Sequence, residues 1–136
     1  MLVNSYVGGV RVNIAYLFSC LEQDEEHYQI MFKKYELAFS VTDTSPYLTQ
    51  QEYYIRYALS FVPQVGNLVV NKLDDIFLSL EFFVEILQEL ERNKSGLICN
   101  EDNLEFKAPL NNLTQTVLQQ LPLSKLYKTN YTTIIH

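Results

Sequence analysis

The chain has 136 residues and a formal net charge of −6 at neutral pH, with 48 % hydrophobic and 19 % charged residues. These values exclude wholesale disorder and correspond to one globular domain, which we take as residues 1–136 with 1–9 and 123–136 as loose ends. The acidic balance disfavours direct binding of nucleic acid or of an anionic membrane surface.

The cysteines and the N-terminus suggest a compartment. Cys20 and Cys99 each stand in apolar surroundings, which favours two reduced core residues over a disulfide. Residues 1–5 lack the basic segment of a signal peptide, and the apolar run over 14–21 is too short to span a membrane. We therefore expect a cytoplasmic protein.

Helical spacing dominates residues 10–40, since no glycine or proline lies between Gly9 and Pro46. The acidic stretch 22–26 interrupts the apolar stripe, so the segment is either one helix or two helices that divide near 22–24. We favour two, because acidic residues stabilise a helix N-terminus. The apolar positions are Ile14, Leu17, Leu21, Tyr28, Met31, Phe32, Tyr35 and Phe39.

A further helix is predicted from about 47 to 62, after turn residues at 41–46. It can begin either with Ser45 and Pro46 or with a capping box over 49–52. Its expected apolar face consists of Ile55, Ala58, Leu59 and Val62.

Four tyrosines lie on that helix. Because tyrosine is enriched at the rims of protein interfaces, we predict that Tyr53 and Tyr57 contact a partner. The alternatives are that Tyr54 and Tyr57 form the edge of the core and that Tyr47 packs as a staple at the helix start.

The longest periodic segment is 67–92, where apolar residues recur every four and then three positions. This pattern predicts one amphipathic helix, about 39 Å long at 1.5 Å per residue, with Gly96 in the C-terminal capping place. The seam is Val69, Leu73, Ile76, Leu80, Phe83, Leu87 and Leu90, and a second ridge is formed by Leu78, Phe82 and Ile86.

After this segment the period changes. Residues 97–106 indicate a short β-hairpin around a polar turn at 100–103. Pro109 opens a last helix, which Pro122 ends. The apolar face of this helix is Leu110, Leu113, Val117, Leu118 and Leu121.

Signatures of catalysis are absent from the sequence: it has no glycine-rich phosphate loop, no Cys-x-x-Cys and no His-Glu-x-x-His. A divalent cation could bind Glu22, Asp24, Glu25, Glu26 and His27, but a solvated acidic helix start is the favoured interpretation. We thus predict no catalytic, cofactor-binding or metal-binding residue and no cofactor.

Together these patterns predict a mainly α protein: a bundle of about five helices around the central helix 67–92, with a small hairpin near 97–106. The favoured function is a non-enzymatic protein–protein interaction module, such as an adaptor, inhibitor or assembly factor, in homodimeric form. The first alternative is an acidic immunity or inhibitor protein that neutralises a basic partner such as a nuclease, and the second is an enzyme without recognisable motifs. The candidate partner-binding residues are Tyr53, Tyr57, Leu78, Phe82, Ile86, Glu81, Glu85 and Glu89.

Overall fold

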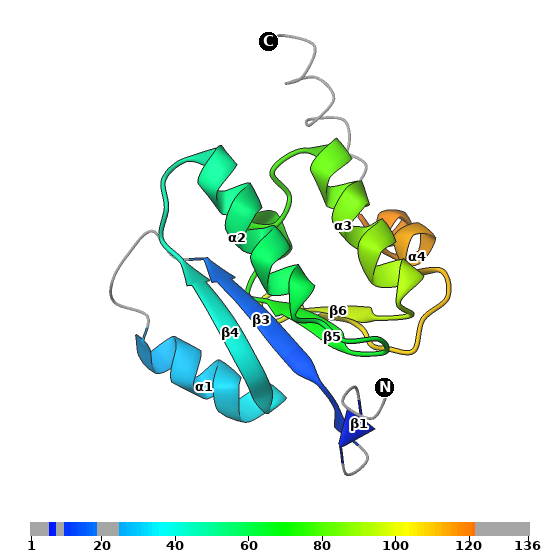
Figure 1. The fold of residues 1–136 in the computed structure, drawn as a ribbon, viewed down its shortest axis with the longest axis horizontal. Coiled ribbons are helices and arrows are strands. Elements are labelled where there is room, and N and C mark those ends of the chain that lie inside the picture. Colours follow the sequence, from blue (N-terminus) through cyan, green and yellow to red (C-terminus); the bar gives the residue numbers. More distant parts are fainter. Residues whose placement is uncertain (1–5, 8–9, 19–24, 122–136) are drawn as a thin grey trace, which may run out of the picture.

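The computed structural model describes residues 6–7, 10–18 and 25–121, and over these residues the chain is an α/β protein (Figure 1). Its elements in chain order are β1 (Tyr6–Val7), β2 (Val10–Arg11), β3 (Asn13–Phe18), α1 (Glu25–Tyr35), β4 (Leu37–Asp43), α2 (Leu48–Ser60), β5 (Asn67–Val70), a 3-10 helix (Leu73–Asp75), α3 (Leu80–Arg92), β6 (Gly96–Cys99), β7 (Leu104–Phe106) and α4 (Leu113–Gln120).

A five-stranded mixed sheet forms the centre, in the order β4-β3-β5-β6-β7. The first four strands in this order are parallel, and β7 pairs antiparallel with β6. Counted along the chain, the parallel strands stand in the order 2-1-3-4, which is the arrangement of doubly wound α/β sheets. Separately, β1 and β2 form a small antiparallel pair.

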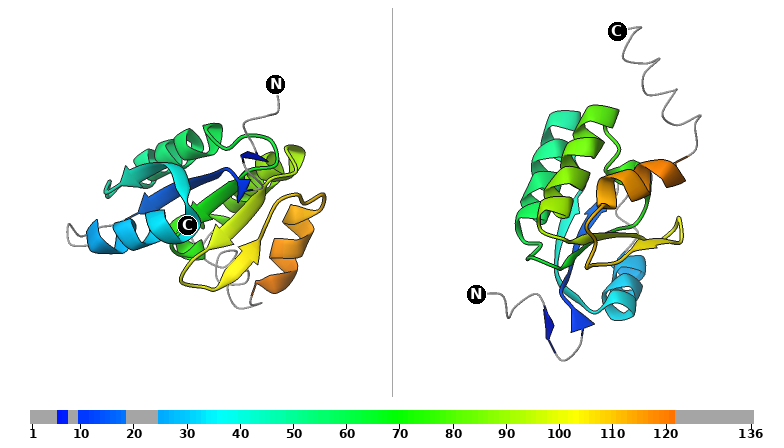
Figure 2. Two further views of the ribbon diagram at one scale, coloured as in Figure 1. Left: turned by 90° about the horizontal axis from the view of Figure 1, so that it is seen from below. Right: turned by 90° about the vertical axis from the view of Figure 1, so that its right-hand side faces the viewer.

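Helices cover both faces of this sheet (Figure 2). Alternate strand residues such as Ile14, Leu68 and Leu97 pack with α2, α3 and α4 on one face. The residues between them belong to a second, smaller core on the opposite face, where α1 contributes Met31 and Tyr35. The protein is therefore a three-layer structure whose two sides are unequally covered.

The predicted mainly α fold, with a helical bundle around 67–92, is wrong. That segment divides into β5, the 3-10 helix and α3, so Val69, Leu73 and Leu87 lie in three different elements. Most seam residues are buried, as expected, but they are buried by successive elements and not along one helix face. A short strand that is covered on both faces has no alternating pattern, so its apolar run imitates part of a helix.

The helical prediction for 10–40 is also wrong in part, because β3 and β4 enclose α1 there. The described part of α1 begins at Glu25, within the acidic stretch 22–26. Residues 19–24 lie outside the described part of the chain, so the division near 22–24 is not described.

Three local predictions are confirmed. The helix predicted over 47–62 is α2, the hairpin near 97–106 is the β6–β7 pair, and a last helix, α4, is present. The predicted start of that last helix at Pro109 is wrong, because α4 begins at Leu113. The two predicted caps of α2 are not formed, because its N-cap residue is Tyr47, which makes no side-chain capping bond.

Gly96 does not cap the helix before it. α3 ends in a Schellman motif: Lys94 N–H donates to Glu91 O at 2.9 Å, and Ser95 N–H donates to Leu90 O at 2.9 Å. The left-handed residue is Lys94, with φ 54°. Gly96 instead starts β6, where an added Cβ would lie 2.2 Å from Phe106 O.

Candidate protein-binding surface

Five aromatic side chains form a continuous exposed patch, which we call the aromatic surface. Each is between 37 % and 63 % exposed, an unusual amount for large rings in a folded domain. Its members are Phe39 on β4, Tyr53, Tyr54 and Tyr57 on α2, and Phe61 directly after α2.

These rings contact one another in sequence. Tyr53 and Tyr57 stack with centroids 6.4 Å apart, and Tyr57 meets Phe61 edge to face at 5.0 Å. Phe61 reaches Phe39 at 4.6 Å, which joins the helix to the strand. Tyr53 also packs edge to face with Tyr54 at 5.4 Å. Such contacts hold the rings in fixed orientations, so the aromatic surface is ordered.

The spacing of residues on α2 explains why this patch is exposed. Tyr53, Tyr57 and Phe61 recur at i, i+4 and i+8, so they lie along one side of the helix. The buried side of α2, with Ile55 and Ala58, faces the sheet. The aromatic side therefore faces away from α3 and toward β4.

The sheet ends at β4, and among the described residues no strand pairs with the outer edge of β4. Ala38, Phe39 and Thr42 on this strand are exposed. β4 contains no lysine, arginine or proline, and Asp43, its only charged residue, is buried. An uncharged edge strand is a template for pairing with a further strand.

A buried hydrogen-bond group fixes the turn between β4 and α2. The Tyr16 hydroxyl donates to Asp43 Oδ2 at 2.6 Å, while Ser45 donates to Asp43 Oδ1 from its backbone N–H at 2.9 Å and from its hydroxyl at 2.6 Å. Gln51 Nε2 donates to Ser45 O at 3.0 Å. These bonds set the position of α2 over the strand edge, and with it the position of the rings.

Other predicted partner residues lie in less accessible places. Phe82 and Ile86 are buried in the main core, and Leu78 is half-buried against it. The second ridge is thus part of the interior, which leaves only the tyrosines and the acidic side chains of the predicted set on the surface.

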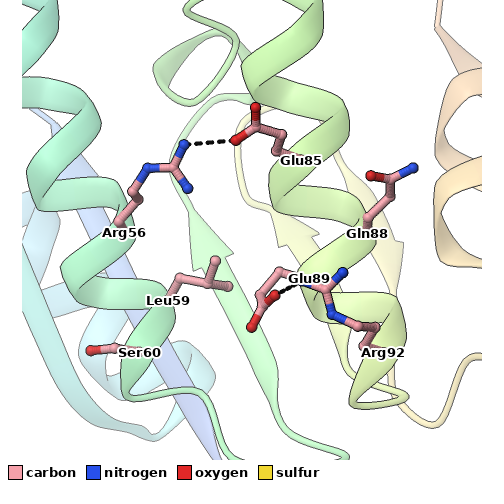
Figure 3. Close-up of a pocket in the computed structure, with 7 residues that line it drawn as sticks. All are labelled: Arg56, Leu59, Ser60, Glu85, Gln88, Glu89 and Arg92. Carbon is pink, nitrogen blue, oxygen red and sulfur yellow. Dashed lines mark hydrogen bonds and ion pairs between the residues drawn. The ribbon is translucent and has the colours of Figure 1, made fainter.

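The predicted acidic stripe lies beside a groove of about 410 Å³ between α2 and α3 (Figure 3). Arg56 pairs with Glu85 at 2.7 Å and with Glu52 at 3.2 Å, and the hydrogen bond to Glu85 raises the pKa of the Arg56 guanidinium. Glu89 pairs with Arg92. Two of the three stripe carboxylates, at 85 and 89, are therefore partly neutralised within the protein, and Glu81 is exposed.

In doubly wound sheets, ligands bind outside the carboxyl ends of the strands, at the point where the strand order reverses. Here the loops after β5 and β6 are tied together at that end. Leu73 N–H donates to Asp102 Oδ2 at 2.6 Å, and Asn71 Nδ2 donates to Glu101. Burial raises the pKa of Asp75 to about 6. The loop after β3 lies outside the described residues, so no ligand site is assigned at this end.

The metal hypothesis concerned Glu22 and Asp24, which also lie outside the described residues, together with Glu25, Glu26 and His27. Within the described part of the chain, no group of three or more His, Cys, Asp or Glu residues is placed to hold a metal ion. Cys99 is a free, buried thiol whose pKa is raised by desolvation to about 12, so it is a weak nucleophile.

Sequence reasoning missed Phe39 and Phe61 as members of the surface. Their contact depends on β4 lying beside the end of α2, which a helical assignment of Phe39 could not reveal. The available signal was the apolar, uncharged run from Leu37 to Val41, which also fits a strand.

These features define a class: a doubly wound α/β domain with an exposed aromatic surface at one sheet edge. Neither the protein-family models nor the curated protein sequences compared with the chain give a match. In the described residues, no helix has the length and apolar character needed to cross a membrane.

Proposed function

We propose that this protein is a non-enzymatic protein-binding module that uses the aromatic surface as its docking site. The observation that carries the proposal is the chain of ring contacts from Tyr53 through Tyr57 and Phe61 to Phe39, all of it exposed. Tyrosine and other aromatic rings dominate the energetic centres of protein interfaces, because each buries a large area at low entropic cost.

A small-molecule site is less well supported by the same surface. The groove at its end, lined by residues including Asp43, Thr49 and Tyr54, is open to solvent and has a volume of about 360 Å³. The buried carboxylate of Asp43 is already bonded to Tyr16 and Ser45. An open row of exposed rings suits contact with a protein better than enclosure of a small ligand.

The acidic-inhibitor alternative gains no specific support. Arg56 and Arg92 already pair with Glu85 and Glu89, so a basic partner would have to displace these arginines. Exposed ion pairs of this kind each contribute less than about 1 kcal/mol, but they lower the local negative field.

Site-specific crosslinking tests the proposal. A photoreactive phenylalanine analogue at Tyr53 or Tyr57 should give a protein adduct on irradiation in the native host, while the same analogue at Gln119, exposed on α4, should not. The substitution Phe61→Ser should lower the yield from Tyr57, because Phe61 packs against that ring. Equal yields at all three positions would contradict the proposal.

We also propose that the protein works in the cytoplasm. The free thiol of Cys99 supports a reducing compartment. Imaging of the tagged chain in its host tests this placement.

A further inference from the structure

We propose that the partner on the aromatic surface is a second copy of this chain, bound by antiparallel pairing of β4 with β4 around a two-fold axis. The inference rests on the proposed function and specifies its partner. An edge strand is self-complementary in the antiparallel sense, because a two-fold axis through its middle places each residue opposite its equivalent. The two five-stranded sheets would then form one continuous sheet.

Layer geometry supports this arrangement. α2 packs over β3 and β4, as Figure 1 shows from one side. Since neighbouring strands lie about 4.8 Å apart, the midlines of α2 in the two copies would be two strand spacings apart, or about 9.6 Å. Packed helices in proteins are separated by about 8–10 Å. The two α2 helices would therefore meet directly above the new strand pair.

The contacting sides of those helices would be the aromatic ones. Tyr53, Tyr57 and Phe61 lie on the side of α2 that faces the strand edge, and Phe39 projects from β4 on the same face as Ile14, its partner in the register of β3. Across the two-fold axis, each row of rings would face its own copy and lose its exposure to water. Burial of aromatic area is the main driving force expected for such an interface.

The opposite face leaves room for this pairing. α1 packs Met31 and Tyr35 against Leu17, Val69 and Ile98, which lie on β3, β5 and β6. α1 also contacts β4, but Ala38 and Thr42 on that strand remain exposed, so the described part of α1 leaves them accessible.

Charge also favours this face for self-contact. A chain with a net charge of −6 repels its own copy over most approach directions. The aromatic surface has no ionisable acid or base besides its phenols, and β4 exposes no charged side chain. Two acidic molecules can therefore meet at this face with little charge repulsion.

The first measurement is the oligomeric state, by light scattering after size-exclusion chromatography and by analytical ultracentrifugation. Concentrations from about 1 to about 300 µM cover weak and moderate dimers. The wild type should form a dimer, and Tyr57→Glu should weaken self-association at least about tenfold, because it places a charge in the seam. Gln115→Glu adds the same charge on α4, away from the edge, and should dimerise like the wild type.

Hydrogen exchange locates the contact. Backbone amides of residues 37–43 should become more protected as the wild-type concentration rises, and should show no such dependence in Tyr57→Glu. Circular dichroism spectra that match the wild type establish that both variants fold.

Three outcomes separate the possibilities. A dimer with concentration-dependent protection of residues 37–43 supports the inference. A strict monomer overturns it, and crosslinking of a different protein at Tyr57 would then leave the proposed function standing. A dimer that Tyr57→Glu does not weaken, or that leaves the exchange of residues 37–43 unchanged, shows pairing through another face and also overturns it.

Discussion

At the scale of single residues, the fold depends on a few polar groups held inside it. Asp43 is 1 % exposed, and both of its carboxylate oxygens accept hydrogen bonds from Tyr16 or Ser45. Asn67 Nδ2 donates to Asn13 Oδ1 at 3.0 Å, and Asn67 Oδ1 accepts from Ala108 N–H at 2.9 Å. Buried polar groups are tolerated when they are satisfied in this way, and they then fix one arrangement of the strands.

Asp75 provides a pH-dependent prediction. Burial raises the pKa of Asp75 from an unfolded value of 3.8 to about 6. The free energy of unfolding therefore falls as the pH rises from about 4 to about 6, and it stays at the lower value above pH 6. Asp75→Asn should therefore stabilise the protein by about 1 kcal/mol at pH 7.5, a value reduced to allow for its solvent exposure, and by close to nothing at pH 4. Urea unfolding at the two pH values measures this difference.

In that variant the amide oxygen can still accept the hydrogen bond that Lys72 N–H donates at 3.2 Å, so the test isolates the charge. A gain that is equal at pH 4 and pH 7.5 would show that ionisation of Asp75 is not the cause.

Gly96 is the most crowded glycine among the described residues. A Cβ at this position would lie 2.2 Å from Phe106 O and 2.5 Å from Ala108 N, and backbone atoms cannot move aside without shifting β7. Gly96→Ala should lower the free energy of unfolding by about 3 kcal/mol in chemical denaturation. Gly66→Ala is the graded control, since its nearest contact is the side chain of Pro63 at 2.8 Å, and it should cost less. Equal losses in the two variants would refute this explanation.

At the scale of elements, helices and strands with local sequence signals could be predicted, and those that depend on long-range contacts could not. α2, α4 and the β6–β7 hairpin were accessible because their turn residues and apolar spacing lie within one stretch of sequence. β5 was missed because its apolar residues 68–70 continue the helical spacing of the segment that follows, whereas β6, which is equally buried, lies between Gly96 and the polar turn at 100–103. The Ser79 side chain, which accepts from Phe82 N–H at 3.0 Å, was the unused sign that α3 begins there.

The candidate site shows the same limit. Tyr53 and Tyr57 stood out from composition and helical spacing, and the structure places both on the surface. Phe39 could be added only once β4 was known to lie beside the end of α2, which is a tertiary relationship. The prediction that the ridge with Phe82 and Ile86 contacts a partner failed for the same reason. These residues are buried in the core, and the sheet that covers them could not be inferred from the helical spacing.

The end of α3 gives a prediction about one element. Lys94 occupies the left-handed position of the Schellman motif, where glycine avoids the steric cost of a Cβ. Lys94→Gly should raise the free energy of unfolding by about 0.5–1 kcal/mol. Lys94→Ala keeps the Cβ and removes the charge, so it should give no such gain. Thermal unfolding of the three proteins makes the comparison, and equal gains in both variants would assign the effect to the charge.

At the scale of the whole molecule, the two sides of the sheet differ in the helices that cover them, and its two edges differ in length and surroundings. One edge ends in the short antiparallel strand β7, whereas the other ends in the longer β4 beside the aromatic surface. An acidic chain with one neutral, aromatic edge is suited to contacts that avoid charge.

Ionic strength tests this view. Raising the salt concentration from about 20 to about 500 mM screens the repulsion between two acidic copies, so self-association should strengthen modestly. Sedimentation equilibrium of the wild type at the two concentrations measures the change in dissociation constant. An acidic docking face would behave in the opposite way, because its attraction for a basic partner weakens as salt is added. Dissociation of the dimer at high salt would therefore contradict an aromatic interface.

The central position of β3 has a consequence for synthesis of the chain. Its inner neighbour β5 lies far along the sequence, with Asn13 opposite Asn67. While the ribosome makes the residues between them, β3 can pair only with β4, and its other side carries unsatisfied amides and carbonyls next to apolar side chains. Pairing across such a long loop is slow, and exposed strand edges favour aggregation in the meantime. The nascent chain is therefore most vulnerable before residue 70 emerges, and chaperone demand during translation should be concentrated in that interval.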